Sequence, residues 1–203
     1  MNLLTKTLLT AALATAATLP AQTQLVRGDV DGIRNTQGLF QLDCTQIPLV
    51  SNTVNLQQLH DQSRQQDIEY ELQVVNIGTP AAPRLDVISA NVIPEMFQMG
   101  NLRFGRSETW EVLAAPNSQL WILVDARVNT GYLPLGAAGT WVLGPSAVPF
   151  AQGATNAFGR FQTRFTMPTL PALVGQEITG QAVIQDGAGF LISNPDCKEV
   201  RNG

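Results

Sequence analysis

The sequence is poor in charge, and two residue types on which many active sites depend are almost missing. Only 14% of the 203 residues are charged, His60 is the single histidine, and Lys6 and Lys198 are the two lysines. A phosphate-binding loop needs a lysine directly after a glycine-rich turn, and neither lysine has that position. A catalytic triad needs a histidine oriented by a third group, which Asp61 cannot provide from the next position in the chain. We therefore expect a protein that is not an enzyme, with no catalytic residue and no cofactor.

Long apolar runs are missing as well, apart from one short stretch at the start. Met1–Lys6 carries one positive charge, the 11 residues Thr7–Ala17 carry none, and Pro20 and Ala21 follow. These are the three parts of a secretory signal peptide. A helix that spans a bilayer needs ~20 apolar residues, so a permanent anchor is not indicated. We predict that residues 1–21 are cleaved after Ala21, with Ala17 as the alternative site. An N-terminal core helix is the competing interpretation.

Removal of the signal leaves an acidic protein with no remaining transmembrane span. Residues 22–203 contain 11 basic and 16 acidic side chains, a net charge near −5. Proteins that bind nucleic acids present basic faces, so this balance argues against a nucleic-acid partner. The expected location is outside the cytoplasm, in the periplasm, at the cell surface or in the medium. The expected partner is an extracellular protein or a glycan.

Cysteine is rare, and its two copies lie near opposite ends of the exported chain. Cys44 and Cys197 can form only one intrachain disulfide, which an oxidising compartment favours. Two buried free thiols are the alternative. A structural zinc site needs four ligands, so two cysteines and one histidine cannot form one without carboxylates. No metal site is predicted.

Turn-forming residues separate short stretches in which apolar and polar side chains alternate. The clearest is 67–77, where Ile68, Tyr70, Leu72 and Val74 alternate with polar residues. This period of two is typical of a strand with one buried and one solvent-exposed face. Further strands are expected at 84–93, 107–113, 119–127, 140–143, 160–167, 178–185 and 190–193, and one or two helical turns or a loop near 57–64. Such spacing predicts an all-β protein: one antiparallel sandwich over residues 22–203, Greek-key and immunoglobulin-like or jelly-roll-like, with short helical turns only.

Carboxylate pairs are the remaining route to hydrolysis, because a glycosidase needs only two such groups. Glu69 and Glu71 share a strand face about 7 Å apart by the strand rise. Glu108 and Glu111 flank Trp110 on another expected strand. Alternating strands normally expose such acids to water, so a carboxylate-dependent glycoside hydrolase is the weakest hypothesis.

Two other motifs have some of the features of binding sites. The segment Gly28–Gly32 contains Asp29 and Asp31 but lacks the later ligands and the glycine of a calcium loop, so only a looser two-carboxylate site is conceivable. Trp110 and Trp141 could stack on a sugar if both were exposed on one face, whereas core packing is the ordinary role of such residues. A lectin-like carbohydrate-binding module is therefore the alternative to a structural or interaction domain.

The C-terminal third carries a series of short motifs in a fixed order. They are Leu133–Gly136, Phe158–Phe161, Met167-Pro168, Pro171–Gly175, Gln181–Val183 with Asp186, and Gly189–Asn194. In this order they resemble a C-terminal module of uncharacterised secreted proteins from planctomycete-type bacteria, over residues ~131–195. Thr179-Gly180 stand where such modules commonly carry an aromatic residue, and the tail 196–203 is added. The resemblance implies a β-sandwich outside the cytoplasm and no particular activity.

Overall fold

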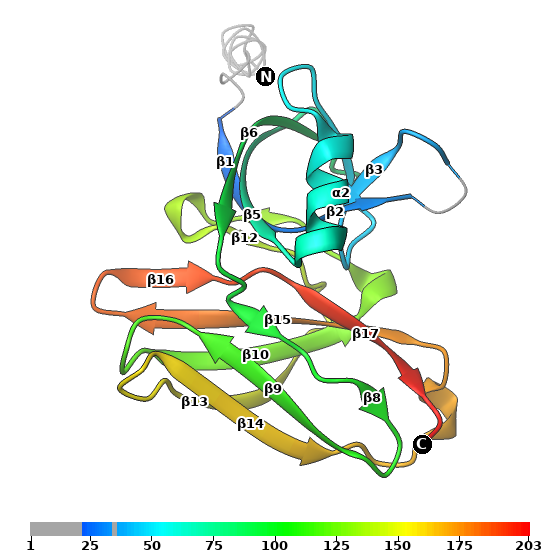
Figure 1. The fold of residues 1–203 in the computed structure, drawn as a ribbon, viewed down its shortest axis with the longest axis vertical. Helices are drawn as coiled ribbons and strands as arrows, with labels where there is room; N and C mark the ends of the chain where they lie inside the picture. Colours follow the sequence, from blue (N-terminus) through cyan, green and yellow to red (C-terminus); the bar gives the residue numbers. More distant parts are fainter. Residues whose placement is uncertain (1–21, 34–35) are drawn as a thin grey trace, which may run out of the picture.

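The computed structural model describes residues 22–33 and 36–203, and strands are its main regular structure (Figure 1). In chain order the strands are β1 (Gln24–Gly28), β2 (Val30–Gly32), β3 (Phe40–Leu42), β4 (Pro48–Val50), β5 (Glu69–Asn76), β6 (Leu85–Ile93), β7 (Phe97–Gln98), β8 (Leu102–Arg103), β9 (Ser107–Leu113), β10 (Gln119–Ala126), β11 (Leu133–Pro134), β12 (Thr140–Trp141), β13 (Val148–Ala154), β14 (Arg160–Thr166), β15 (Glu177–Asp186), β16 (Gly189–Ile192) and β17 (Asp196–Arg201). Helix α2 (Leu56–Gln66) lies between β4 and β5, and single 3₁₀ turns occupy Arg127–Asn129, Gly136–Ala138 and Pro171–Leu173.

The C-terminal part is a sandwich, which confirms the all-β, sandwich-like prediction. One sheet has the order β13-β10-β15-β17-β8, with β16 also paired to β15, and the other has the order β14-β9-β7. Their facing side chains form one apolar core around Trp110, Ile122 and Ile184. Burial of such side chains is the main force that holds two sheets together.

The N-terminal sheet closes on itself, which the sequence analysis did not anticipate. Its order is β1-β5-β6-β4-β3-β2, and only Asp29 separates its two end strands, β1 and β2, in the chain. β1 and β2 therefore form one bent strand, which pairs with β5 through β1 and with β3 through β2. All pairs are antiparallel except β4 with β6, and α2 links β4 to β5. These connections are those of the five-stranded Greek-key barrel called the OB-fold.

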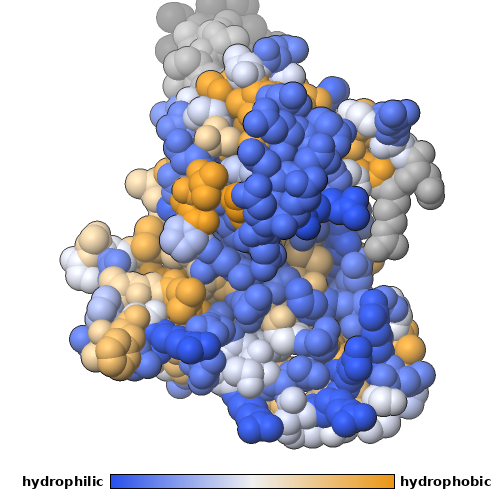
Figure 2. All heavy atoms as spheres, viewed as in Figure 1, coloured by the Kyte–Doolittle hydropathy of each residue, from blue (hydrophilic) through white to orange (hydrophobic). Residues whose placement is uncertain are grey.

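The bend that closes this barrel depends on Gly28. Its φ of 147° lies in a region that side-chain-bearing residues rarely adopt, and a Cβ there would lie 3.0 Å from Leu42 Cδ1. The barrel has a core of its own around Leu42, Leu72 and Leu85. Helix α2 runs along the barrel and shows a hydrophilic outer face (Figures 1 and 2), because it buries only Leu56 and Ser63.

Barrel and sandwich are joined at several points distant in sequence. The segment between β10 and β13 leaves the sandwich as the hairpin β11–β12 and contacts β1, and Val142 after it is part of the barrel core. Cys44, which follows β3, forms a disulfide with Cys197 in β17. The predicted disulfide is thus present, and it links the barrel to the last strand.

Several sequence predictions can be placed on this fold. The strand expected at 67–77 is β5, and its apolar residues Tyr70, Leu72 and Val74 are buried as predicted. The helix α2 has 11 residues, longer than the one or two turns considered. No helix in the described ranges is long and apolar enough to cross a membrane. The predicted signal peptide, residues 1–21, lies outside the described residues.

Candidate functional site

Three carboxylate side chains stand in a row across neighbouring strands of the barrel. The β1–β5 ladder pairs Gly28 with Tyr70, so its next step sets Asp29 opposite Glu69. The β2–β3 ladder pairs Val30 with Leu42, so its next step sets Asp29 opposite Asp43, whose N–H donates to Asp29 O at 3.0 Å. Directly opposed side chains on antiparallel strands have Cβ atoms about 5 Å apart. Asp29 therefore has an acidic neighbour on each side.

These carboxylates are buried and poorly satisfied. Glu69 is only 9% exposed, and its Oε1 accepts a hydrogen bond from Asn194 Nδ2 at 3.1 Å. Glu69 Oε2 and Asp29 Oδ1 are buried, and neither has a hydrogen-bond partner among the described residues. Unpaired buried carboxylate oxygens are costly, so two of them at neighbouring positions are unusual.

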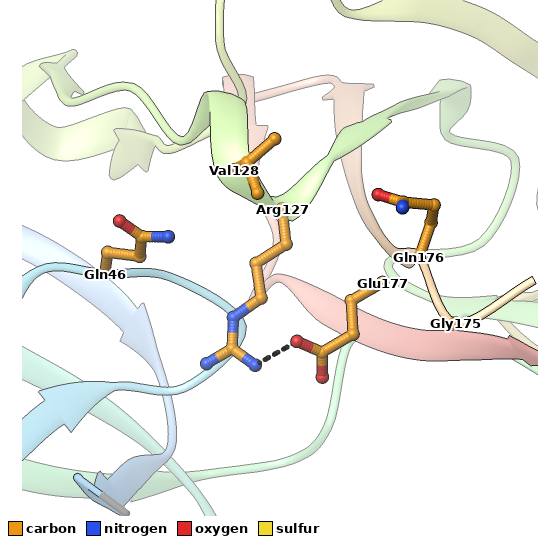
Figure 3. A pocket seen from close by; sticks show the side chains of 6 residues that line it. All are labelled: Gln46, Arg127, Val128, Gly175, Gln176 and Glu177. Atoms are coloured by element: carbon orange, nitrogen blue, oxygen red, sulfur yellow. Dashed lines mark hydrogen bonds and ion pairs between the residues drawn. The ribbon is translucent and has the colours of Figure 1, made fainter. Parts of the chain in front are cut away.

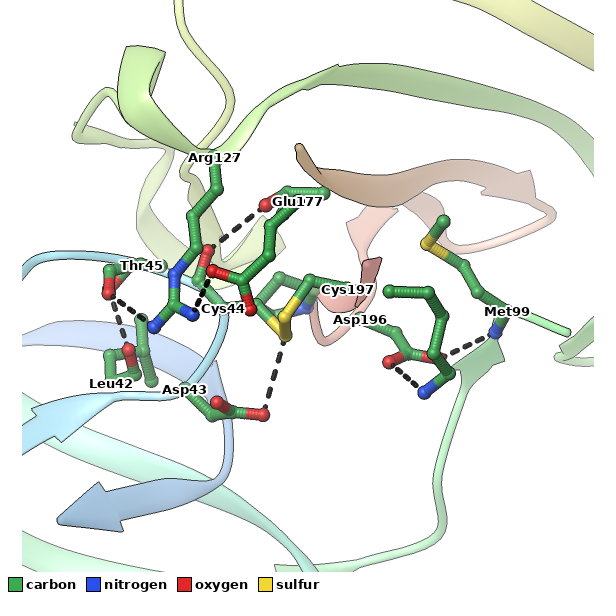
Figure 4. Close-up of a disulfide and its surroundings, with 12 residues drawn as sticks. Leu42, Asp43, Cys44, Thr45, Met99, Arg127, Glu177, Asp196 and Cys197 are labelled. Atoms are coloured by element: carbon green, nitrogen blue, oxygen red, sulfur yellow. Dashed lines mark hydrogen bonds and ion pairs between the residues drawn. A yellow bond between two sulfur atoms is a disulfide. The ribbon is translucent and has the colours of Figure 1, made fainter. Parts of the chain in front are cut away.

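One carboxylate oxygen of Asp43 packs against the disulfide. Its Oδ2 lies 3.3 Å from Cys44 Sγ, the contact drawn in Figure 4. Cys44 is in a disulfide, so its sulfur has no proton to donate. The contact is therefore close packing, and the hydrogen bond that the Asp43 carboxylate accepts comes from the backbone N–H of Cys44.

The electrostatic consequence is that the acidic groups hold protons more tightly than usual. Burial, followed by repulsion from Asp43, raises the pKa of Asp29 to about 7. Burial, followed by repulsion from Asp29, raises the pKa of Glu69 well above its ordinary value. Burial is also the main cause of the raised pKa of Asp43, and, with repulsion from Asp196, it raises the pKa of Glu95 to about 7. Ionisation of this cluster is unfavourable unless positive charge enters it.

A cavity of about 300 Å³ opens beside the row. Its walls carry four aspartates together with one arginine, one histidine and one serine: Asp29, Asp31, Asp43, Asp67, Arg64, His60 and Ser63. The His60 Nδ1 lies 2.9 Å from Val30 O, which can only accept, so this nitrogen donates. Solvent and small ions can reach Asp29 and Asp43 through this cavity.

A second concavity, of about 360 Å³, lies on the barrel between β3, β4 and the start of α2. Its floor is apolar and includes Phe40, Leu49 and Leu56, while Leu39 at its edge is 54% exposed. The hydroxyl and amide side chains that line it are Ser51, Asn55 and Gln57, and none of the described residues in its lining is charged. We call this the barrel groove.

A third pocket, of about 280 Å³, is drawn in Figure 3 and lies where the barrel meets the sandwich. Arg127 crosses it and donates from Nη1 to Glu177 Oε2 at 2.8 Å. Its Nη2 donates to Thr45 O at 3.2 Å, in the same loop as Cys44. Arg127 and Glu177 neutralise each other in this pocket. We therefore interpret their contact as a structural link between barrel and sandwich.

The structure separates the carboxylate pairs suggested by the sequence. Glu71 is bound by Arg27, whose Nη2 lies 2.7 Å from its Oε2, while Glu69 is buried beside Asn194. The expectation of a wet face around Glu69 is thus wrong, because the segment before β17 covers it. Arg160 binds the carboxylate of Glu111. Glu108 therefore has no free carboxylate at Glu111 with which to act as a pair. Glu71 and Glu111 are thus each engaged by an arginine.

The tryptophan platform is not formed. Trp110 is 1% exposed, and its ring stacks on Phe150 with centroids 4.2 Å apart inside the sandwich core. Trp141 is half-buried in β12, in the hairpin that contacts the barrel. The suggestion that the two stack on a sugar is therefore corrected: Trp110 is a core residue of the sandwich and is not accessible to a ligand.

The structure supports only part of the loose two-carboxylate calcium motif at Asp29 and Asp31. Asp29 and Asp31 line the same cavity, yet Asp31 Oδ1 accepts from the N–H of Gly32 at 2.8 Å. The carboxylates that flank Asp29 across the sheet are Glu69 and Asp43, which the sequence analysis did not associate with it. Their proximity depends on strand register, for which the sequence carried no local signal.

Comparison with known proteins adds no further constraint. No protein-family model matches the chain, and no curated protein and no solved structure is significantly similar to it.

Proposed function

We propose that the protein is an exported, non-catalytic interaction module that holds a neutral, partly apolar segment of another protein in its barrel groove. The observation that carries this proposal is the groove itself, which combines an apolar floor, the exposed Leu39 and a rim of neutral polar groups. Apolar pockets with a few hydrogen-bonding groups are the usual form of a recognition site. The absence of charge from the lining favours an uncharged ligand.

Export is part of the proposal and has its own support. The N-terminal sequence has the features of a signal peptide, and the Cys44–Cys197 disulfide is typical of oxidising compartments. The resemblance of residues ~131–195 to modules of secreted planctomycete-type proteins agrees with that location. The partner would then be met at the cell surface or outside the cell.

A glycan ligand is the second candidate. OB-type barrels bind oligosaccharides as well as oligonucleotides, and they use the face around the strands that correspond to β3 and β4. The net acidity of the exported chain disfavours the oligonucleotide. Ser51, Asn55 and Gln57 offer the hydroxyl and amide groups that sugars use, but the groove lacks an exposed aromatic ring.

The test is a binding screen of the exported protein against a neutral glycan array and a displayed peptide library. Selected peptides should share an apolar anchor flanked by uncharged residues. Leu39→Asp should weaken their binding by at least tenfold, because it places a charge at the apolar edge of the groove. Leu170→Asp is the matched control, since Leu170 is 48% exposed in the sandwich, away from the groove. Binding that both variants retain would refute the groove as the site, and selective glycan binding would favour the second candidate.

A further inference from the structure

The row of acidic side chains inside the barrel rim has a chemistry that the groove proposal does not use. Asp29 lies between Glu69 and Asp43 across adjacent strands. Like charges directly opposite each other destabilise a sheet. Asn194, which is fully buried, covers Glu69 from the sandwich side, so water cannot fully screen the repulsion. Such a row is stable only when bound protons or a cation reduce its negative charge.

We propose that Asp29, Asp43 and Glu69 bind a calcium ion at the junction of the barrel and the sandwich. Two independent observations point to a ligand. Glu69 is more than nine-tenths buried, and its Oε2 has no partner among the described residues. The adjacent Asp29 Oδ1 is buried and unpartnered in the same way, and Asp29 also lines the cavity through which an ion would enter.

The oxygen ligands of the proposed site favour a hard cation. The three ligands are carboxylates, and the nearest sulfurs, those of Cys44 and Cys197, are bonded to each other. Oxygen-only sites suit calcium and magnesium, whereas thiolate and imidazole sites suit zinc and copper. Magnesium demands a near-ideal octahedron at short distance. Calcium accepts six to eight oxygens in irregular arrangements and completes them with carbonyls and water.

The site requires a small adjustment of side chains. Within the described ranges, no three carboxylates bring their oxygens within 4.8 Å of one another. Opposed Cβ positions about 5 Å apart allow convergence by side-chain rotation alone. The ion therefore draws the three strands' carboxylates together without a change in strand register.

Binding there would couple the two halves of the molecule. Glu69 belongs to β5 of the barrel, and it accepts from Asn194, which lies between β16 and β17 of the sandwich. Asp43 precedes Cys44, whose disulfide leads to β17. Calcium at the row would stabilise both connections, and this role is independent of what the groove binds.

The decisive measurement is thermal unfolding of the exported, oxidised protein in EDTA and in calcium chloride at matched ionic strength. Calcium at a hundredfold excess over its dissociation constant should raise the Tm by about 5–10 °C. Elemental analysis after dialysis should find one calcium per chain. Magnesium should give a smaller rise. An unchanged Tm in calcium, together with no bound metal, would overturn the proposal.

Variants separate calcium binding from simple folding. Glu69→Gln keeps the acceptor for Asn194 but removes the charge, and Asp29→Asn does the same at the centre of the row. Both should raise the Tm in EDTA, because they relieve repulsion, and both should lose at least tenfold in calcium affinity by titration calorimetry. Glu108→Gln, on β9 of the sandwich, is the control and should respond to calcium like the wild type. A full calcium response in both Glu69→Gln and Asp29→Asn would refute the assignment of these ligands.

Discussion

Asn194 donates its side-chain amide to Glu69 Oε1 at 3.1 Å, across 125 positions of the chain. The same side chain accepts at Oδ1 from the N–H groups of Met96 and Phe97, at 2.9 and 3.0 Å. Asn194 itself is 0% exposed. One buried amide thus holds together the barrel, the first strand of the sandwich and the segment that leads into β17.

Replacement of this amide should cost much more than replacement of an exposed one. Asn194→Ala leaves two buried N–H groups and Glu69 Oε1 without partners, and we expect a loss of about 3 kcal/mol in the free energy of unfolding. Asn156→Ala is the matched control, because Asn156 Oδ1 also accepts from two N–H groups but in an exposed turn. There water replaces the lost bonds, and the expected loss is about 1 kcal/mol. Urea unfolding measures both, and equal losses would contradict the role of Asn194 as a buried junction.

The disulfide should be the largest single contribution to stability. Cys44 and Cys197 are separated by 153 positions, and a loop of this length gives about 5 kcal/mol in the chain-entropy model. The double variant Cys44→Ser/Cys197→Ser should therefore unfold at much lower denaturant concentration than the oxidised wild type. Dithiothreitol should shift the wild type toward the variant and leave the variant unchanged. If the reductant destabilises both equally, its effect does not act through this bond.

The sequence predicted local features of this fold well and distant ones poorly. The alternation of Tyr70, Leu72 and Val74 identified β5 and its buried face, because that signal depends only on neighbours in the chain. The same pattern assigned Glu69 to a wet face, and this was wrong because Asn194 covers it from the far end of the sequence. The closure of the barrel also depends on non-local pairs, above all the parallel contact of β4 with β6. No spacing of residues encodes such a pairing.

In the candidate site, too, local features could be predicted from the sequence and contacts between distant residues could not. Asp29 was noticed within a glycine-flanked motif, and Cys44 and Cys197 were paired by elimination. The opposition of Asp29 to Glu69 and Asp43 follows from the register of two ladders on either side of one bent strand. Trp110 was considered for a ligand surface, although its place in a short alternating strand fits a core position equally well. Burial decides between these roles, and burial is set by the opposing sheet.

Trp110 should behave as a core residue in mutagenesis. It contacts Phe97, Phe150 and Phe165 through stacked or edge-on rings. Trp110→Ala removes the centre of this cluster and should cost about 4 kcal/mol in the free energy of unfolding. Trp141→Ala, at a half-buried position in β12, should cost clearly less. Chemical denaturation of both variants tests this, and a Trp110→Ala protein as stable as the wild type would contradict the core assignment.

The buried carboxyl groups of Asp29 and Glu95 should make the calcium-free protein less stable as the pH rises. A carboxyl group whose pKa is higher in the folded than in the unfolded chain binds more protons when folded, so the free energy of unfolding falls as pH increases between the two values. Burial and repulsion from Asp196 raise the pKa of Glu95 to about 7, and Asp29 is raised to about 7 by burial and Asp43. Carboxyl side chains of an unfolded chain have pKa values of about 4. The free energy of unfolding in EDTA should therefore decline from about pH 4 to pH 7 through these two groups.

Glu95→Gln isolates one part of this effect. The variant has no carboxyl to ionise at that position, so its unfolding free energy should decline less steeply between pH 4 and pH 7 than that of the wild type. Asp61→Asn is the control, since Asp61 is an exposed side chain of α2 that pairs with Gln57, and its pH profile should follow the wild type. Urea unfolding at a series of pH values in EDTA gives the three slopes. A wild-type slope that is flat or positive in this range would contradict the prediction. It would mean that Asp29 and Glu95 ionise in the folded protein as easily as in the unfolded chain, so that the burial of Glu95 has no energetic consequence.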